Sequence, residues 1–336
     1  MGGERQQASG ALFGLAFGDA LGAPTEFMSY DAILAAYGPD GPRDLVGDPA
    51  RVTDDTQMTL SVAGALATAL EQPPLTAERL EAPLRAEYLA WAASPDNNRA
   101  PGMTCLRAIG RLSDGGSWIQ ASEHGSKGCG ANMRVAPVGL VHGLTDAQRA
   151  GVAQFQAALT HGHPTALAAS ELTMLSVLWL RDGLASADLP AALRERCHSQ
   201  REVYRGDWLG ELWQRPGAVG PEQFIARGWD ECLGVLDRLE AALAVPDRTA
   251  DPCQATGEGW IAEEALATAV LCFLLHPDEP VRALARAAAT SGDSDSIACL
   301  TGAFAGAAHG LEIWPPDWIA RIEYAERLKR FGRMWD

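Results

Sequence analysis

The stretch IACLTGAFAGAA, from Ile297 to Ala308, contains no charged residue. Small and apolar side chains cover every face at helical spacing, so we expect a helix that other helices surround. The stretches Met58 to Leu70 and Glu264 to Leu275 are almost as free of charge. Helices that are buried on all sides need a large helical assembly around them, and the sequence therefore predicts an all-α fold.

Ala- and Leu-rich segments recur along the chain, opened by Ser, Thr or Asp and closed near Gly or Pro. Alternating Val- and Ile-rich runs, which are typical of strands, are almost absent. Thr145 and Gln148 form a capping box. We predict irregular structure at Ser94 to Thr104, Ser113 to Asn132 and Val245 to Gly259. The clearest predicted helices are Ser29 to Tyr37, Thr53 to Leu70, Thr165 to Arg181, Glu222 to Leu243 and Ser294 to His309.

Composition restricts the class of protein. Hydrophobic residues make up 47% of the 336 residues and the net charge is −16, so we expect a globular protein that does not bind bulk nucleic acid. Seven scattered cysteines without a C-x-x-C pair favour reduced thiols. The apolar stretch Ala11 to Phe17 lacks the features of a secretory signal, and Ala265 to Leu275 is too short to cross a membrane. We expect a soluble, cytoplasmic protein.

Two acidic motifs stand where predicted buried helices begin. Thr53-Asp54-Asp55-Thr56 precedes the first helix, and SGDSDS, from Ser291 to Ser296, precedes the second. Each alone could be a helix N-cap, because Ser, Thr and Asp are preferred there and carboxylates suit the positive end of the helix dipole. Adjacent carboxylates before an apolar helix are nevertheless costly unless a cation compensates them.

The pairing of these motifs favours a metal site. Four carboxylates and two hydroxyls form an all-oxygen set that suits Mg²⁺ or Mn²⁺ better than Zn²⁺. The spacing lacks the glycine and the distal glutamate of an EF-hand. These donors are enough for two divalent cations with positions left for water or substrate.

Five motifs in order carry a resemblance to a known family, and it runs from about residue 10 to about residue 310. They are Gly14 to Glu26, Thr53 to Thr56, Gly128 to Arg134, Thr160 to Pro164 and Gly292 to Ser296. On these motifs the chain resembles the ADP-ribosylglycohydrolase family. The resemblance implies a compact all-α fold, which we predict as one domain over residues 1–336.

The resemblance also implies an activity and a ligand set. The expected reaction removes ADP-ribose from a modified acceptor by cleavage at the anomeric carbon of the distal ribose, so the expected partner is an ADP-ribosylated protein or another ADP-ribose conjugate. Many members have Thr where this chain has Ser296, which keeps the hydroxyl. The implied ligands of two Mg²⁺ or Mn²⁺ ions match Thr53, Asp54, Asp55, Asp293, Asp295 and Ser296.

Glu26 follows Gly22-Ala23-Pro24 and has two interpretations. Glutamates past a helix end are usually exposed, whereas the resemblance places this one beside the metals as an acid/base group. We predict the catalytic role. Asp19 lies among small residues on the same buried segment, and we expect it to brace helix packing.

A glycine-rich stretch from Gly125 to Gly130 precedes a predicted helix at Ala131 to His142. Its backbone amides and the helix N-terminus would suit an anion, although a glycine-rich surface loop is equally compatible with the residues alone. The resemblance assigns the ADP-ribose diphosphate to this loop and to His161, while His163 could be structural. The predicted substrate-binding residues are Ser126, Gly128, Cys129, Gly130, Ala131, Asn132, Met133 and His161.

The remaining alternatives concern the acceptor and the activity. The loop Pro95 to Gly102 lies where family members differ and where the modified group is expected, although turn chemistry would also explain it. One alternative is an inactive member that binds ADP-ribose or has a structural role. Another is a different metal-dependent pyrophosphate or phosphoester enzyme, but the chain lacks the D-D-x-x-D pattern of isoprenoid synthases.

Overall fold

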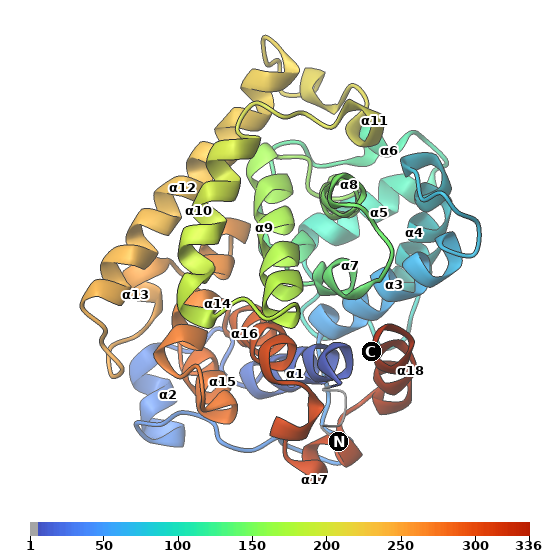
Figure 1. The fold of residues 1–336 in the computed structure, drawn as a ribbon. Helices are drawn as coiled ribbons and strands as arrows, with labels where there is room; N and C mark the ends of the chain where they lie inside the picture. The colour runs from blue at the N-terminus through green and yellow to red at the C-terminus, as the bar shows by residue number, and fades with distance from the viewer. Residues whose placement is uncertain (1–5) are drawn as a thin grey trace.

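Helices form the fold from residue 6 to residue 336, the part of the chain that this computed structural model describes (Figure 1). The predicted all-α class is confirmed, since the β-type pairings in that part are isolated bridges. The helices are α1 (Gln7–Gly22), α2 (Tyr30–Tyr37), α3 (Asp54–Ala69), α4 (Ala77–Ala92), α5 (Met103–Ser113), α6 (Trp118–Ala121), α7 (Ala136–Leu140), α8 (Asp146–Ala158), α9 (Pro164–Arg181), α10 (Leu189–Gln200), α11 (Gly206–Leu209), α12 (Pro221–Ala244), α13 (Cys253–Thr256), α14 (Ala262–Leu275), α15 (Pro280–Ala288), α16 (Ser294–His309), α17 (Pro316–Arg321) and α18 (Ala325–Trp335).

The clearest predicted helices are all present, with ends that agree to within two residues. Ser29 and Thr53 are the N-caps of α2 and α3, and the predicted bounds of α16 match the structure. The capping box between Thr145 and Gln148 opens α8. Two of the predicted irregular stretches each contain one short helix, α6 and α13.

The predicted helix at Ala131 to His142 is wrong. A 3-10 turn, η1 (Cys129–Ala131), is followed by the five-residue helix α7. Pro137 lacks an N–H group and its ring would clash with a carbonyl one turn earlier, so a continuous helix through this position is disfavoured. Pro137 stands instead in the first turn of α7, where proline is tolerated.

Helices α1 and α16 pack against each other with their backbones in contact, in the lower centre of Figure 1. A Cβ atom built on Gly18 would lie 1.9 Å from the carbonyl oxygen of Ala298. Glycine is therefore required where the two backbones meet. The facing positions along this contact are Gly10, Gly14, Gly18 and Gly22 of α1 with Gly310, Gly302, Ala298 and Ser294 in and after α16.

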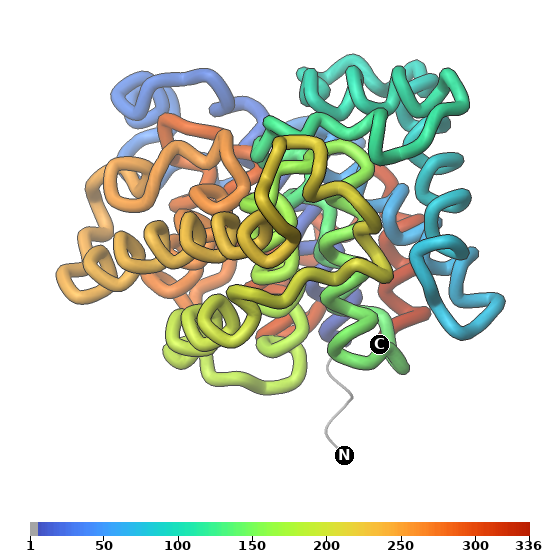
Figure 2. The backbone as a smooth tube through the Cα atoms, turned by 90° about the horizontal axis from the view of Figure 1, so that it is seen from above, coloured from blue at the N-terminus to red at the C-terminus, as the bar shows by residue number. Residues whose placement is uncertain are grey.

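Other helices enclose this central pair. Helices α9, α10 and α12 lie side by side (Figure 1), and α9, α14 and α15 contact α16. The core continues beyond residue 310, because α18 packs on α1 with Phe331 and Trp335 buried. Seen from above, α2 and the segment with α5 and α6 lie along one edge of the molecule (Figure 2). Among the described residues, no helix has the length and apolar character needed to span a membrane.

We expect Gly18→Ala to destabilise the protein by about 3 kcal/mol or more, because the added methyl would overlap the α16 backbone and force the helices apart. Gly110→Ala is the matched control. Gly110 is exposed in α5 with open space around it, so alanine there should be neutral or stabilising by up to about 1 kcal/mol. Thermal and urea unfolding of both variants test this, and equal stabilities would contradict the close contact.

Candidate metal and substrate site

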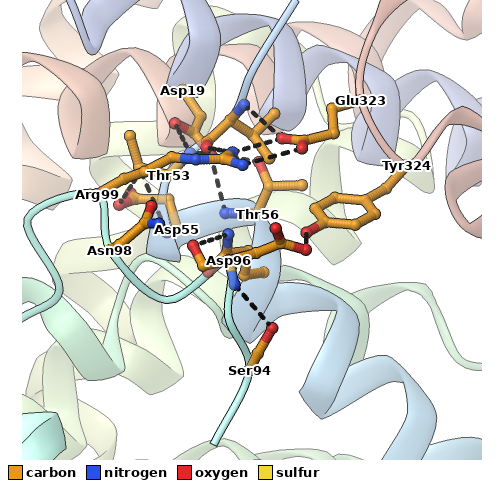
Figure 3. Close-up of polar contacts among 12 residues, drawn as sticks. Asp19, Thr53, Asp55, Thr56, Ser94, Asp96, Asn98, Arg99, Glu323 and Tyr324 are labelled. Atoms are coloured by element: carbon orange, nitrogen blue, oxygen red, sulfur yellow. Dashed lines mark hydrogen bonds and ion pairs between the residues drawn. The ribbon is translucent and has the colours of Figure 1, made fainter. Parts of the chain in front are cut away.

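Asp19 holds the beginning of α3 against α1. Its buried carboxylate accepts hydrogen bonds from the backbone N–H of Thr53 at 2.9 Å and of Thr56 at 3.0 Å, and from the Thr56 hydroxyl (Figure 3). These bonds satisfy amide groups that a helix N-terminus leaves without partners. Asp19 therefore braces α1 and α3 as expected, and does so by capping the helix that begins with Asp54 and Asp55.

The beginning of α16 is fixed equally firmly beside the end of α1. The hydroxyl of Ser294 donates to the carbonyl of Gly22 at 3.0 Å, and the N–H of Asp293 donates to the carbonyl of Glu258 at 2.7 Å. This arrangement brings Glu26, which is half-buried just past α1, close to the second acidic motif. Carboxylate oxygens of Glu26, Asp293 and Asp295 all lie within 4.8 Å of one another, and the group could hold a metal ion.

Both acidic motifs and Glu26 meet in one cavity of about 330 Å³. The side chains of Asp54, Asp55, Asp293, Asp295 and Ser296 line it, and all five residues are buried. One oxygen of Asp55 is buried without a hydrogen-bond partner among residues 6–336. Thr53 differs from the other predicted ligands, because it is the N-cap of α3 and lines a neighbouring cavity.

Burial raises the pKa of every carboxyl group in this cluster, and repulsion between the carboxylates, chiefly from Asp295, raises most of them further. The pKa of Asp54 rises to about 7 and that of Glu26 to about 9. Burial also holds the pKa values of Asp55 and Asp293 well above their ordinary range. Crowded, buried carboxylates with a free oxygen fit a bound divalent cation, since such an ion would favour their charged forms.

The glycine-rich loop forms another wall of the cavity, with Gly128, Cys129, Gly130 and Met133 in the lining. The long helix whose N-terminus was expected to help bind an anion is absent here, because η1 and the five-residue α7 take its place. The role of the loop in binding the diphosphate stays a prediction. The N–H of Cys129 already donates to the carbonyl of Trp260 at 3.0 Å. The predicted residues Ser126, Ala131 and Asn132 are not part of the lining.

Side chains around this loop fix it to α14 and α12. Asn132 donates to the carbonyl of Ala262 at 3.1 Å. The Lys127 ammonium pairs with Glu231 at 2.8 Å and with Glu263. Lys127 therefore secures the loop and does not line the cavity.

His161 lines the cavity beside the loop and is held by a buried arginine. Its Nδ1 lies 2.8 Å from the hydroxyl of Thr160, which accepts a hydrogen bond from Arg134 at 2.8 Å. Burial, with the Arg134 charge adding to it, lowers the pKa of His161 to about 3, so the imidazole is neutral. Its Nε2 faces Gly128. His163 has a structural role instead, because its Nδ1 accepts from the N–H of Thr165 at the start of α9.

Two aromatic residues of the cavity were not found from the sequence. The rings of Phe27 and Trp260 stack with centroids 5.6 Å apart and planes at 16°. Both residues line the cavity, and Phe27 is 71% exposed to solvent. No sequence pattern links two residues so far apart, although Phe27 directly follows Glu26.

The fold and the cavity define an all-helical protein with a buried acidic centre beside a glycine-rich loop. A family profile described as ADP-ribosylglycohydrolase matches residues 3–335. The chain therefore belongs to the ADP-ribosylglycohydrolase family.

Named relatives agree with this assignment. The chain is 26% identical to an ADP-ribosyl-dinitrogen-reductase glycohydrolase of Rhodospirillum rubrum, with 94% of this chain and 90% of that protein covered. It is 27% identical to the mouse ADP-ribosylhydrolase ARH3, with 94% of this chain and 86% of that protein covered. It is 25% identical to the ADP-ribosylarginine hydrolase Tri1 of Serratia proteamaculans, with 97% of this chain and 78% of that protein covered. These homologues are hydrolases of ADP-ribose linkages.

A solved structure supports the fold. It is described as an ADP-ribosylglycohydrolase-related protein complex and superposes with a TM-score of 0.66 at 23% identity, covering 98% of this chain and 96% of that chain. At this identity the likeness concerns the fold alone.

The raised pKa values predict how pH and metal affect stability. Without metal, stability is greatest when these carboxyl groups are protonated, and it is lost as pH rises through the folded pKa values of about 7 and about 9. We expect the Tm of chelator-treated protein to fall between about pH 5 and about pH 8, and Mg²⁺ or Mn²⁺ to raise Tm more at the higher pH. Potassium chloride at matched ionic strength controls for screening. A Tm that does not respond to Mg²⁺ or Mn²⁺ at the higher pH would contradict a metal site here.

Proposed function

We propose that this protein is a metal-dependent hydrolase that removes ADP-ribose from a modified acceptor. The observation that carries the proposal is the convergence of Glu26, Asp293 and Asp295, with oxygens within 4.8 Å of one another, in the cavity that also holds Gly128 and His161. With cations bound, the carboxylate cluster would suit the hydroxyls of a ribose, while the neutral His161 and the glycine-rich loop beside it would suit the attached diphosphate. The scattered cysteines support a cytoplasmic location.

The residues that would hold two Mg²⁺ or Mn²⁺ ions are Asp54, Asp55, Asp293, Asp295 and Ser296, with Thr53 at the edge of the set. When bound, such ions supply a Lewis acid for the ribose hydroxyls and for water. Asp19 orients two of the carboxylates through the N-terminus of α3. The family assignment and the all-oxygen donor set support this choice of ions.

The substrate's diphosphate would lie along the wall formed by Gly128, Gly130 and Met133. Small residues let a ligand approach the backbone closely, and neutral His161 can donate from Nε2 when Thr160 donates to Nδ1. With the diphosphate there, the distal ribose reaches the acidic cluster. Its anomeric carbon then lies on the side of the cavity that Glu26 closes.

In the proposed reaction, the bond between the anomeric carbon and the acceptor atom breaks and its electron pair goes to the acceptor. The oxygen of a water molecule bonds to the anomeric carbon, and one proton of that water ends on the acceptor. The products are ADP-ribose and the free acceptor. Glu26 is the proposed group that moves this proton, and the surrounding carboxylates stabilise positive charge developing on the ribose.

Asp295→Asn tests the proposal directly. Asp295 faces both Glu26 and Asp293, so we expect its loss to abolish hydrolysis of ADP-ribosyl-arginine and ADP-ribosyl-serine peptides in the presence of Mg²⁺ or Mn²⁺ while the helical circular dichroism is unchanged. Asp31→Asn, on the exposed side of α2, is the control and should retain activity. Wild-type turnover in excess chelator would refute metal dependence. Turnover of a phosphoester substrate alone would favour a phosphoester enzyme, and ADP-ribose binding without turnover would favour an inactive member.

Glu26→Gln separates a catalytic role from a metal-binding one. A proton donor or acceptor contributes a factor of roughly 10² to 10⁴ to rate, so we expect kcat to fall by that amount while metal affinity changes little. Glu258→Gln is the matched control, since Glu258 is exposed and its backbone carbonyl, which the substitution keeps, accepts from the N–H of Asp293. Joint loss of metal and activity would make Glu26 a ligand, and near-wild-type kcat would remove it from the mechanism.

A further inference from the structure

A second cavity, of about 570 Å³, adjoins the acidic one. The two cavities share Glu26, Phe27 and Ala100, which form a rim between them. Phe27 and Ala100 both have positive φ, of 66° and 49°, an uncommon backbone conformation for residues other than glycine. Such conformations persist where surrounding contacts impose them, often at ligand sites. The surrounding structure therefore holds the rim in a defined conformation at the edge of the acidic centre.

We propose that this second cavity, hereafter the acceptor lobe, receives the leaving acceptor and favours an uncharged, hydroxyl-linked acceptor over a guanidinium. The inference rests on the proposed function. The acceptor lobe contains no residue of the glycine-rich loop and meets the acidic cavity at Glu26, Phe27 and Ala100. With the diphosphate against Gly128 and Gly130, the acceptor would therefore leave toward Glu26. The acceptor lobe begins at that residue.

The lining of the acceptor lobe suits an uncharged group. Its walls are mostly apolar, formed by Phe27, Val46, Pro49, Val52 and Ala100. Val46 is 68% exposed, so an apolar surface is presented to solvent there. Among the residues that the structure describes, Glu26 on the rim is the one carboxylate in the lining that could pair with a guanidinium.

Of the two arginines that line the acceptor lobe, Arg99 is paired with a carboxylate and Arg51 is exposed. Arg99 is paired with Glu323 at 3.0 Å through Nη2, and a second contact joins its Nη1 to the same carboxylate (Figure 3). Arg51 is exposed, and its guanidinium has no hydrogen bond or ion pair within residues 6–336. A guanidinium acceptor would therefore meet an uncompensated positive charge, whereas an uncharged acceptor would not.

The wall that carries Arg99 is held in place. The Asp96 carboxylate accepts from the Tyr324 hydroxyl at 3.1 Å (Figure 3), and the N–H of Gly102 donates to the metal-site residue Asp54 at 3.1 Å. The lobe is thus fixed relative to the acidic centre. The backbone on either side of Arg51 is held as well, because the N–H of Ala50 donates to the carbonyl of Arg321 at 2.8 Å and the N–H of Val52 donates to the Glu323 carboxylate at 3.1 Å.

The test compares kcat/KM for ADP-ribosyl-serine and ADP-ribosyl-arginine peptides of the same sequence context, with Mg²⁺ or Mn²⁺ present. We expect the wild-type protein to prefer the serine conjugate. Arg51→Glu should shift the ratio of the two values about tenfold toward the arginine conjugate, and Val46→Asp should shift it in the same direction. Both shifts should shrink at high salt, because charge repulsion at an exposed site is screened.

Arg333→Glu is the matched control, since it makes the same charge change at an exposed position of α18 away from both cavities. A wild-type preference for the arginine conjugate, or a ratio that neither lobe variant moves beyond the control, would overturn the acceptor lobe. Hydrolysis of neither conjugate would overturn the proposed function itself. Circular dichroism of each variant confirms that it is folded.

Discussion

The contact between the backbones of α1 and α16 is the constraint on which the site depends. Glycines along α1 let the two helices meet without side chains between them, as at Gly18 and Ala298. The end of α1 is thereby set beside the beginning of α16, which brings Glu26 to Asp293 and Asp295. A wider separation between the helices would move these carboxylates apart.

A cluster of buried carboxylates opposes folding unless it is neutralised. Hydrogen bonds offset part of the cost at Asp19, where the N-terminus of α3 supplies three donors. Asp55 keeps a buried oxygen that has no hydrogen-bond partner in the described part of the chain. The structure thus concentrates negative charge next to open cavity space, which is the condition for binding a cation and for stabilising positive charge on a sugar.

Local sequence features predicted the parts of the fold that local physics decides. The sequence predicted the helices without charged residues and the acidic motifs at their beginnings. It also predicted the helix starts at Ser29 and Thr53, which are N-caps in the structure. The break at Pro137 was missed because small residues on either side mimic a helix. The hydroxyl of Thr53, which the sequence assigns to the metal set, also caps α3, and that assignment stays a prediction. The stacking of Phe27 on Trp260 and the two cavities around Glu26 arise from tertiary packing. The spacing of apolar residues along the sequence carries no information on such packing.

The most direct test of the acidic centre is an electron paramagnetic resonance titration of the chelator-treated protein with Mn²⁺. Free Mn²⁺ gives a six-line spectrum, so binding is read from its loss. We expect the first two equivalents of Mn²⁺ per chain to be taken up and to show spin coupling, because the carboxylates of α3 and α16 converge in one cavity. A six-line signal that grows in proportion to Mn²⁺ from the first addition would contradict a metal centre built by these helices.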